Sequence, residues 1–145
     1  LPLHGAVRRW RTMCISEAII KEIHEDARSK FWLRTNDNLP DSPIHHLCAL
    51  AFASDLGLLA TAMLPHDTSL FHGEIMAASL DHALWFHNPY IQSQDWHLYL
   101  TDSPWAGSGR GFARGCMYTR EGQLIASTTQ EGMIRPLTPA KPTKG

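Results

Sequence analysis

The pattern of apolar and polar positions divides the chain into one long apolar run and several shorter strand-like segments. The apolar run extends from Ile44 to about Met63 and follows Asp41-Ser42-Pro43. A polar cap residue with proline at the first helical position is typical of a helix start. We therefore expect a helix over this run, and a helix that is apolar on nearly every side must be enclosed by other elements.

Five further segments are strand-like and are bounded by turn residues such as Asn88-Pro89 and Arg120-Glu121-Gly122. In chain order they are Ala27 to Thr35, Ala77 to His87, Trp96 to Asp102, Arg110 to Thr119 and Leu124 to Ile134. Most of them are consecutive and separated by short turns, so we expect hairpins. The pattern predicts an α+β fold in which an antiparallel sheet wraps around a central helix.

The length of the chain and its two terminal segments give weaker indications of structure. The 145 residues are one domain's worth of sequence, and residues 27–135 are expected to form that domain. Residues 1–26 carry isoleucines at helical spacing, which predicts a short amphipathic helix or a linker. Residues 136–145 contain three prolines and predict a flexible tail. Because the chain opens with Leu1 and not methionine, we expect it to be a piece of a longer protein.

Charge and apolar content argue against several classes of protein. Lys and Arg total 13 against 14 Asp and Glu, with no long basic run, so nucleic acid is not expected as a partner. The longest apolar stretch, Leu47 to Leu64, is interrupted by polar residues and ends at Pro65, which favours a buried helix over a membrane span. We expect a soluble protein.

The motifs of several common sites are missing from the sequence. Three widely spaced cysteines indicate neither a zinc site nor a disulfide framework and fit a reducing compartment. The nine histidines show no metal-binding spacing, and no Gly-x-Ser-x-Gly occurs, so neither a metal nor a serine hydrolase is expected. The glycines of 107–111 lack phosphate-loop spacing and are better explained by a bulge or a close backbone approach, with Arg110 and Arg114 as candidate anion contacts.

Polar residues inside apolar or strand-like sequence are the candidates for chemistry, because burying them is costly. Asp55 lies in the most apolar segment. Either Asp55 or Ser54 caps a second helical turn after a break near Gly57, or Asp55 is a buried acid that needs partners. The residues alone do not separate these two interpretations.

Two strand segments carry the remaining candidates. Ser79 and Asp81 share one face by alternation, with His82 on the other. Gln130 lies in the middle of a later strand, with a side-chain amide that can donate and accept hydrogen bonds. On the residues alone, a structural role explains Ser79, Asp81 and His82 better than catalysis, and a surface position is the ordinary explanation of Gln130. A hydratase or dehydratase would use an acid and a histidine such as Asp81 and His82.

The motifs together resemble, almost residue for residue, the C-terminal half of the acyl-CoA thioesterase II family. The resemblance covers the chain from about Phe31 to Arg135. It rests on Ala53-Ser54-Asp55, Leu80-Asp81-His82 with Trp85-Phe86-His87-x-Pro89, Arg110-Gly111-Phe112 and Gln130-Glu131-Gly132, and Asp102 to Gly107 is closest to the peroxisomal branch.

This resemblance implies the second half of a double hotdog fold and an acyl-CoA thioesterase, which hydrolyses fatty acyl-CoA to a free fatty acid and coenzyme A. The family's catalytic residues fall on Asp55, Ser79 and Gln130, which would activate a water without metal or cofactor, and Asp81 would be structural. An N-terminal hotdog half, missing or on a separate chain, and a homo-oligomer are the expected partners, in a peroxisomal or cytoplasmic location. A noncatalytic acyl-CoA-binding or assembly module is the alternative.

Overall fold

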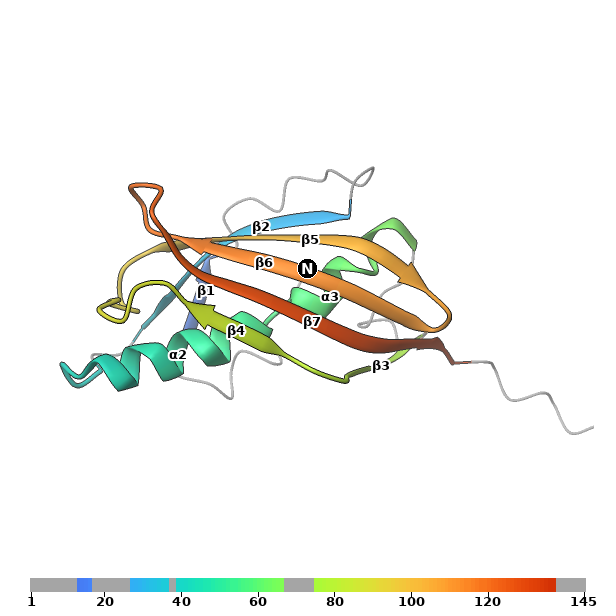
Figure 1. The fold of residues 1–145 in the computed structure, drawn as a ribbon, viewed down its shortest axis with the longest axis horizontal. Coiled ribbons are helices and arrows are strands. Elements are labelled where there is room, and N and C mark those ends of the chain that lie inside the picture. Colours follow the sequence, from blue (N-terminus) through green and yellow to red (C-terminus); the bar gives the residue numbers. More distant parts are fainter. Residues whose placement is uncertain (1–12, 17–26, 37–38, 67–74, 138–145) are drawn as a thin grey trace, which may run out of the picture.

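The computed structural model describes residues 13–16, 27–36, 39–66 and 75–137, and Figure 1 shows their arrangement. Two helices and seven strands make up most of this part of the chain. In chain order the elements are β1 (Met13–Ser16), β2 (Arg28–Thr35), α2 (Pro43–Asp55), α3 (Leu58–Thr61), the 3-10 turn Leu64–His66, β3 (Ile75–Ser79), β4 (Ala83–Phe86), β5 (His97–Gly107), β6 (Arg110–Tyr118) and β7 (Leu124–Pro136).

The strands form one antiparallel sheet with the order β1-β2-β5-β6-β7-β3, in which β4 also pairs with β7. The helices lie together along one face of this sheet (Figure 1), with α3 in contact with β5, β6 and β7 and α2 in contact with β4. The core between the two layers is made mainly of aliphatic and aromatic side chains. It includes Leu33, Leu50, Ala53, Leu58, Tyr99, Met117 and Ile125. The expected α+β arrangement is confirmed.

The expected helix over Ile44 to Met63 is broken in the structure. Pro43 stands in its first turn as predicted, but α2 ends at Asp55 and Leu56 is extended. Gly57 then takes a φ of +75°, a left-handed conformation that glycine adopts without steric cost, and α3 starts at Leu58. By length and composition the stretch Pro43–His66 is apolar enough to cross a membrane, but here it is divided and packed on the sheet.

The expected strand over Ala77 to His87 is also divided. The main-chain N–H groups of Leu80 and Asp81 both point to the carbonyl of Glu131, and a carboxylate oxygen of Asp81 accepts the N–H of Glu131 at 2.7 Å. A side chain thus replaces a main-chain partner, which interrupts the ladder between β3 and β4. The break leaves Ser79 as the last residue of β3.

The structure describes only parts of the two ends of the chain. Met13–Ser16 is a strand paired with β2 and not helical, and the remainder of residues 1–26 lies outside the described residues. At the other end β7 extends to Pro136, one residue beyond the expected domain boundary. Residues 138–145 of the expected tail lie outside the described part of the chain.

Two glycines let α3 lie directly on the backbone of the sheet. A Cβ atom built at Gly111 of β6 would be 2.6 Å from the Cβ of Ala62, and one built at Gly132 of β7 would be 2.3 Å from a methyl group of Leu59. Side chains larger than hydrogen cannot be accommodated at such separations without movement. The predicted close backbone approach is therefore confirmed at Gly111, and these contacts fix the distance between the helical layer and β7.

Candidate active site

The side chain of Gln130 brings together the three residues on which the family resemblance places the catalytic site. Gln130 lies on β7 and is completely buried. Its amide nitrogen is 2.6 Å from Oδ1 of Asp55, the last residue of α2, and 2.7 Å from Oγ of Ser79, the last residue of β3. Groups separated by 51 and 75 positions in the sequence thus meet at one nitrogen atom.

The donors and acceptors of this cluster can be assigned from their chemistry. A carboxamide nitrogen has two hydrogens, and here one points to Asp55 and the other to Ser79. Asp55 Oδ1 and Ser79 Oγ are both acceptors in these bonds, so the hydroxyl hydrogen of Ser79 remains available for a third group. The cluster combines an anionic acceptor with a hydroxyl donor, an arrangement that can hold and deprotonate a water molecule.

The cluster opens to the surface on one side. Asp55 and Ser79 are exposed, whereas Gln130 is buried and forms the inner end of the site. The expectation that Asp55 is buried is wrong, because it stands where α2 ends and the chain turns outward. The capping interpretation is also wrong, since Gly57 occupies the N-cap of α3 and no side chain caps it.

Asp81 and His82 bond to different groups. Asp81 accepts the N–H of Glu131, the structural role that the resemblance implies for it. His82 lies 2.7 Å from Oγ of Ser54 through Nε2. The hydroxyl of Ser54 donates its hydrogen to the carbonyl of Ala51, so the histidine nitrogen is the donor in this bond. These contacts therefore do not join Asp81 and His82 into the acid–histidine pair that hydratase chemistry needs.

The two candidate anion contacts have acidic partners. Arg110 pairs with Glu131 at 3.2 Å, and Arg114 forms a two-point contact with Asp102 in which Nε is 3.0 Å from Oδ1. Within residues 13–16, 27–36, 39–66 and 75–137, no three His, Cys, Asp or Glu side chains gather as metal ligands.

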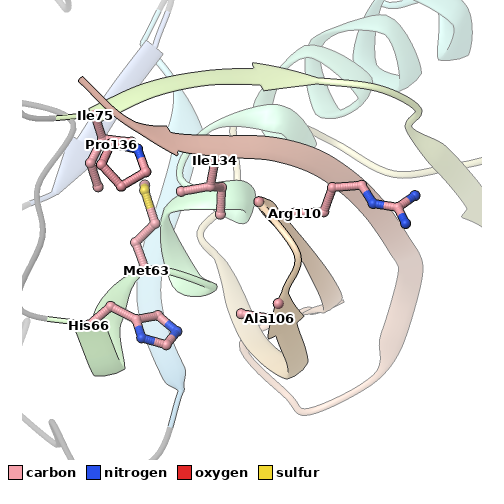
Figure 2. Close-up of a pocket in the computed structure, with 9 residues that line it drawn as sticks. Met63, His66, Ile75, Ala106, Arg110, Ile134 and Pro136 are labelled. Atoms are coloured by element: carbon pink, nitrogen blue, oxygen red, sulfur yellow. The ribbon is translucent and has the colours of Figure 1, made fainter. Parts of the chain in front are cut away.

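An apolar cavity of about 270 Å³ lies farther along β7 (Figure 2). Its lining includes Met63, Ile75 and Ile134, and Arg110 stands at its side. Ile134 and Gln130 lie on the same face of β7, the one toward the helices. They are four positions apart, which corresponds to about 13 Å along a strand. The contact of Leu59 with Gly132 stands between the cavity and Gln130.

The structure also contains a contact that no sequence motif indicated. The hydroxyl of Tyr99 donates to the carbonyl oxygen of Ser54 at 2.8 Å, directly before Asp55 in the chain. Burial raises the pKa of this phenol. Tyr99 is one of many apolar or aromatic residues in a strand, and only the three-dimensional structure places its hydroxyl beside the site.

The curled antiparallel sheet around a helix and the polar cluster at the helix end define a protein of the hotdog class. A hot dog fold protein of unknown function from Alicyclobacillus acidocaldarius shares this fold, with a TM-score of 0.60 at 14% identity over 87% of this chain and 46% of that chain. Residues 8–133 match the family model of acyl-CoA thioesterase, and the chain belongs to this family. The family expected from the motifs is thus confirmed.

Relatives in animals and bacteria support this assignment. Acyl-coenzyme A thioesterase 8 of Mus musculus is 40% identical over 111 residues, and acyl-CoA thioesterase 2 of Haemophilus influenzae is 39% identical over 104 residues. The alignments cover 76% and 72% of this chain but only 34% and 36% of the two relatives. The crystal structure of the acyl-CoA thioesterase II TesB2 from Mycobacterium marinum has a TM-score of 0.69 at 40% identity, over 79% of this chain and 44% of that chain.

Proposed function

We propose that this chain is the catalytic half of an acyl-CoA thioesterase that hydrolyses fatty acyl-CoA to a free fatty acid and coenzyme A. The observation that supports the proposal most directly is the Gln130 amide, which bonds to both Asp55 and Ser79 at an open helix end. A thioester is reactive enough to be attacked by a positioned water, so no covalent intermediate with the protein is needed.

In this mechanism Asp55 is the general base. A water bound between Asp55 and Ser79 attacks the thioester carbonyl carbon and gives one proton to the carboxylate, while the hydroxyl of Ser79 donates to the water oxygen. Gln130 holds both side chains and so fixes the direction of attack. The carbon–sulfur bond then breaks, and the departing sulfur of coenzyme A takes the proton back from Asp55.

The apolar layer between helices and sheet suits the substrate's acyl chain. The cavity next to Met63, Ile75 and Ile134 provides apolar surface on the same face of β7 as Gln130. An acyl chain gains stability from such surface, at about 0.8 kcal/mol for each buried methylene group. Coenzyme A is more polar and, in this proposal, lies at the surface where two hotdog halves meet.

The proposed partner is a second hotdog half. The chain spans about a third of the length of its curated relatives, which leaves room for another domain in those proteins. In the described part of the chain, β3 and β4 pair only with β7, so their outer edge is open, and Trp85 and Phe86 of β4 are exposed. Open sheet edges are normally paired or covered, and pairing with the N-terminal half or a second copy meets that need.

The experiment is to measure thiol release from a long-chain acyl-CoA by this chain alone and by the longer protein that contains it. Activity of the longer protein that disappears with Asp55→Ala, at unchanged circular dichroism, supports the proposal. Substrate binding without thiol release in both proteins would instead identify a noncatalytic module. The proposed location is intracellular, peroxisomal or cytoplasmic, where Cys48 and Cys116 remain free thiols as they are here.

A further inference from the structure

The residue before Asp55 is held by a tyrosine from the sheet. The last carbonyl groups of a helix have no partner one turn farther along, and an unsatisfied buried carbonyl is costly. In α2 the carbonyl of Ser54 accepts the hydroxyl of Tyr99 on β5 at 2.8 Å. Both residues are completely buried, so this bond anchors the main chain at the point from which Asp55 projects.

The same hydroxyl also contacts the strand that carries Gln130. Tyr99 Oη lies 2.8 Å from Oγ1 of Thr128, which precedes Gln130 by two positions on the same face of β7. A phenol has one hydrogen, and Tyr99 gives it to Ser54, so Thr128 is the donor in the second bond. One oxygen atom therefore joins the helix end beside Asp55 to the strand beside Gln130.

The surroundings of this oxygen are closely packed. A Cβ atom at Gly115 of β6 would lie 2.3 Å from the Tyr99 ring and 2.6 Å from Thr128 Oγ1. The ring also packs edge-on against Phe31, with centroids 5.2 Å apart. Because burial raises the pKa of Tyr99, the hydroxyl keeps the hydrogen that the bond to Ser54 requires.

We propose that Tyr99 is a positioning residue whose hydroxyl sets the separation between Asp55 and Gln130. The inference rests on the proposed thioesterase function, because it assigns Tyr99 a role in that site. Asp55 and Gln130 must be 2.6 Å apart for the amide to hold the carboxylate, and they come from different layers of the fold. Besides the bond between Asp55 and Gln130 themselves, the Tyr99 hydroxyl is a hydrogen-bonded link between these layers next to both residues.

The test is Tyr99→Phe in the longer protein, since this change keeps the ring and removes only the hydroxyl. Small displacements of catalytic groups are costly, so kcat for a long-chain acyl-CoA should fall about tenfold to a hundredfold. KM should stay within about twofold, because no contact with the substrate is removed. A kcat within about twofold of the parent protein would overturn the inference.

Thr101→Val is the matched control. Thr101 lies two positions after Tyr99 on β5, is buried, and bonds to Thr61 of α3 at 2.8 Å. The change removes a similar buried hydroxyl bond between the same strand and a helix, but not one beside Asp55. Thr101→Val should lower the melting temperature as Tyr99→Phe does and leave kcat unchanged. An equal loss of kcat in both variants would mean that reduced stability causes the loss, and it would contradict the proposal.

A double-mutant cycle separates this inference from the proposed function. If Tyr99 acts through Asp55, Tyr99→Phe should have no further effect on the residual activity of Asp55→Asn. Full additivity of the two changes would refute positioning through Asp55, whereas undiminished activity of Asp55→Asn alone would refute the proposed function. Should Tyr99→Phe fail to fold, Thr128→Val breaks the same link from the β7 side, and the same loss of kcat is expected.

Discussion

The amide nitrogen of Gln130 lies 2.6 Å from a carboxylate oxygen of Asp55, although the two residues are 75 positions apart. The contact joins the buried middle of a strand to the exposed end of a helix. An amide orients the carboxylate without neutralising it as an arginine or lysine would. In the proposed mechanism this leaves Asp55 free to accept a proton from water, which is the property that a general base needs.

Replacing Gln130 by glutamate tests this relationship. In Gln130→Glu the two hydrogens that now bond to Asp55 and Ser79 are lost, and a second carboxyl group is placed against Asp55. Two carboxylates this close cannot both be ionised easily, so one of them holds a proton up to a higher pH. We expect kcat to fall at least about a hundredfold at pH 8, the range that loss of general-base catalysis gives.

The pH dependence of Gln130→Glu adds a second criterion. At lower pH the introduced carboxyl group carries a proton and can again donate one hydrogen bond, so the loss relative to the parent protein should be smaller at pH 6 than at pH 8. Thiol-release assays over this range at saturating substrate provide the measurement. A constant ratio of the two activities over the whole range would argue against direct contact between residues 55 and 130 during catalysis.

Ser79 should tolerate threonine but not alanine. Its Oγ accepts from Gln130, and its own hydrogen is free to bind water. Ser79→Thr keeps the hydroxyl, and we expect activity within about threefold of the parent protein, whereas Ser79→Ala should lower kcat about tenfold or more. Equal activity of the alanine and threonine variants would show that the hydroxyl takes no part in the reaction.

The sequence predicted the elements well because their periodicities are local properties. The antiparallel sheet and the helix beginning near Pro43 follow from apolar patterning and cap residues within a few positions of each other. The break between β3 and β4 did not follow, because it depends on a distant group. The interruption after Ser79 needs the backbone of Glu131 as partner of Asp81.

The site was predicted through resemblance and not through residue chemistry alone. Taken by themselves, Asp55, Ser79 and Gln130 are an acid in an apolar run, a serine in a strand and a mid-strand glutamine, each with an ordinary structural explanation. Only the fold places them around one nitrogen atom. Tyr99 could not have been predicted, because its role depends on the carbonyl of Ser54, and any residue type can supply a carbonyl.

The close packing of α3 on β7 predicts a compensating pair of substitutions. Gly132→Ala would place a methyl group 2.3 Å from Leu59 Cδ2, and we expect it to lower the free energy of unfolding by about 1–3 kcal/mol, as overpacking does. Leu59→Ala alone should cost about 2–5 kcal/mol through the cavity it leaves. In the double variant the added methyl group enters that cavity, so the combined loss should be smaller than the sum.

Urea unfolding of the four proteins measures this coupling. Gly107→Ala is a suitable control, because its Cβ atom would be 3.2 Å from the exposed ring of Trp105, which can move aside. It should change the free energy of unfolding by less than about 0.5 kcal/mol. Additive losses in the Gly132 and Leu59 pair would mean that α3 does not rest on β7 at this point.

Stability should fall on mild acidification because of His97. This histidine is buried, and its Nε2 donates to the carbonyl of Gln92 at 3.0 Å, while Nδ1 has no partner among the described residues. Burial lowers the pKa of His97 more than the Gln92 carbonyl, Asp95 and Glu121 raise it. His97 therefore binds a proton less readily in the folded protein than in the unfolded chain, where its pKa is about 6.5.

The sign of the effect follows from proton binding. Above about pH 6.5 the ring is neutral in both states and has no effect on the pH dependence. Below it, the unfolded state binds more protons, so the free energy of unfolding decreases until the pH reaches the lower pKa of the folded protein. Urea unfolding between pH 7.5 and pH 5 should show this decrease, and His97→Gln, which cannot titrate, should show a smaller slope. An identical slope in both proteins would assign the pH dependence to other groups.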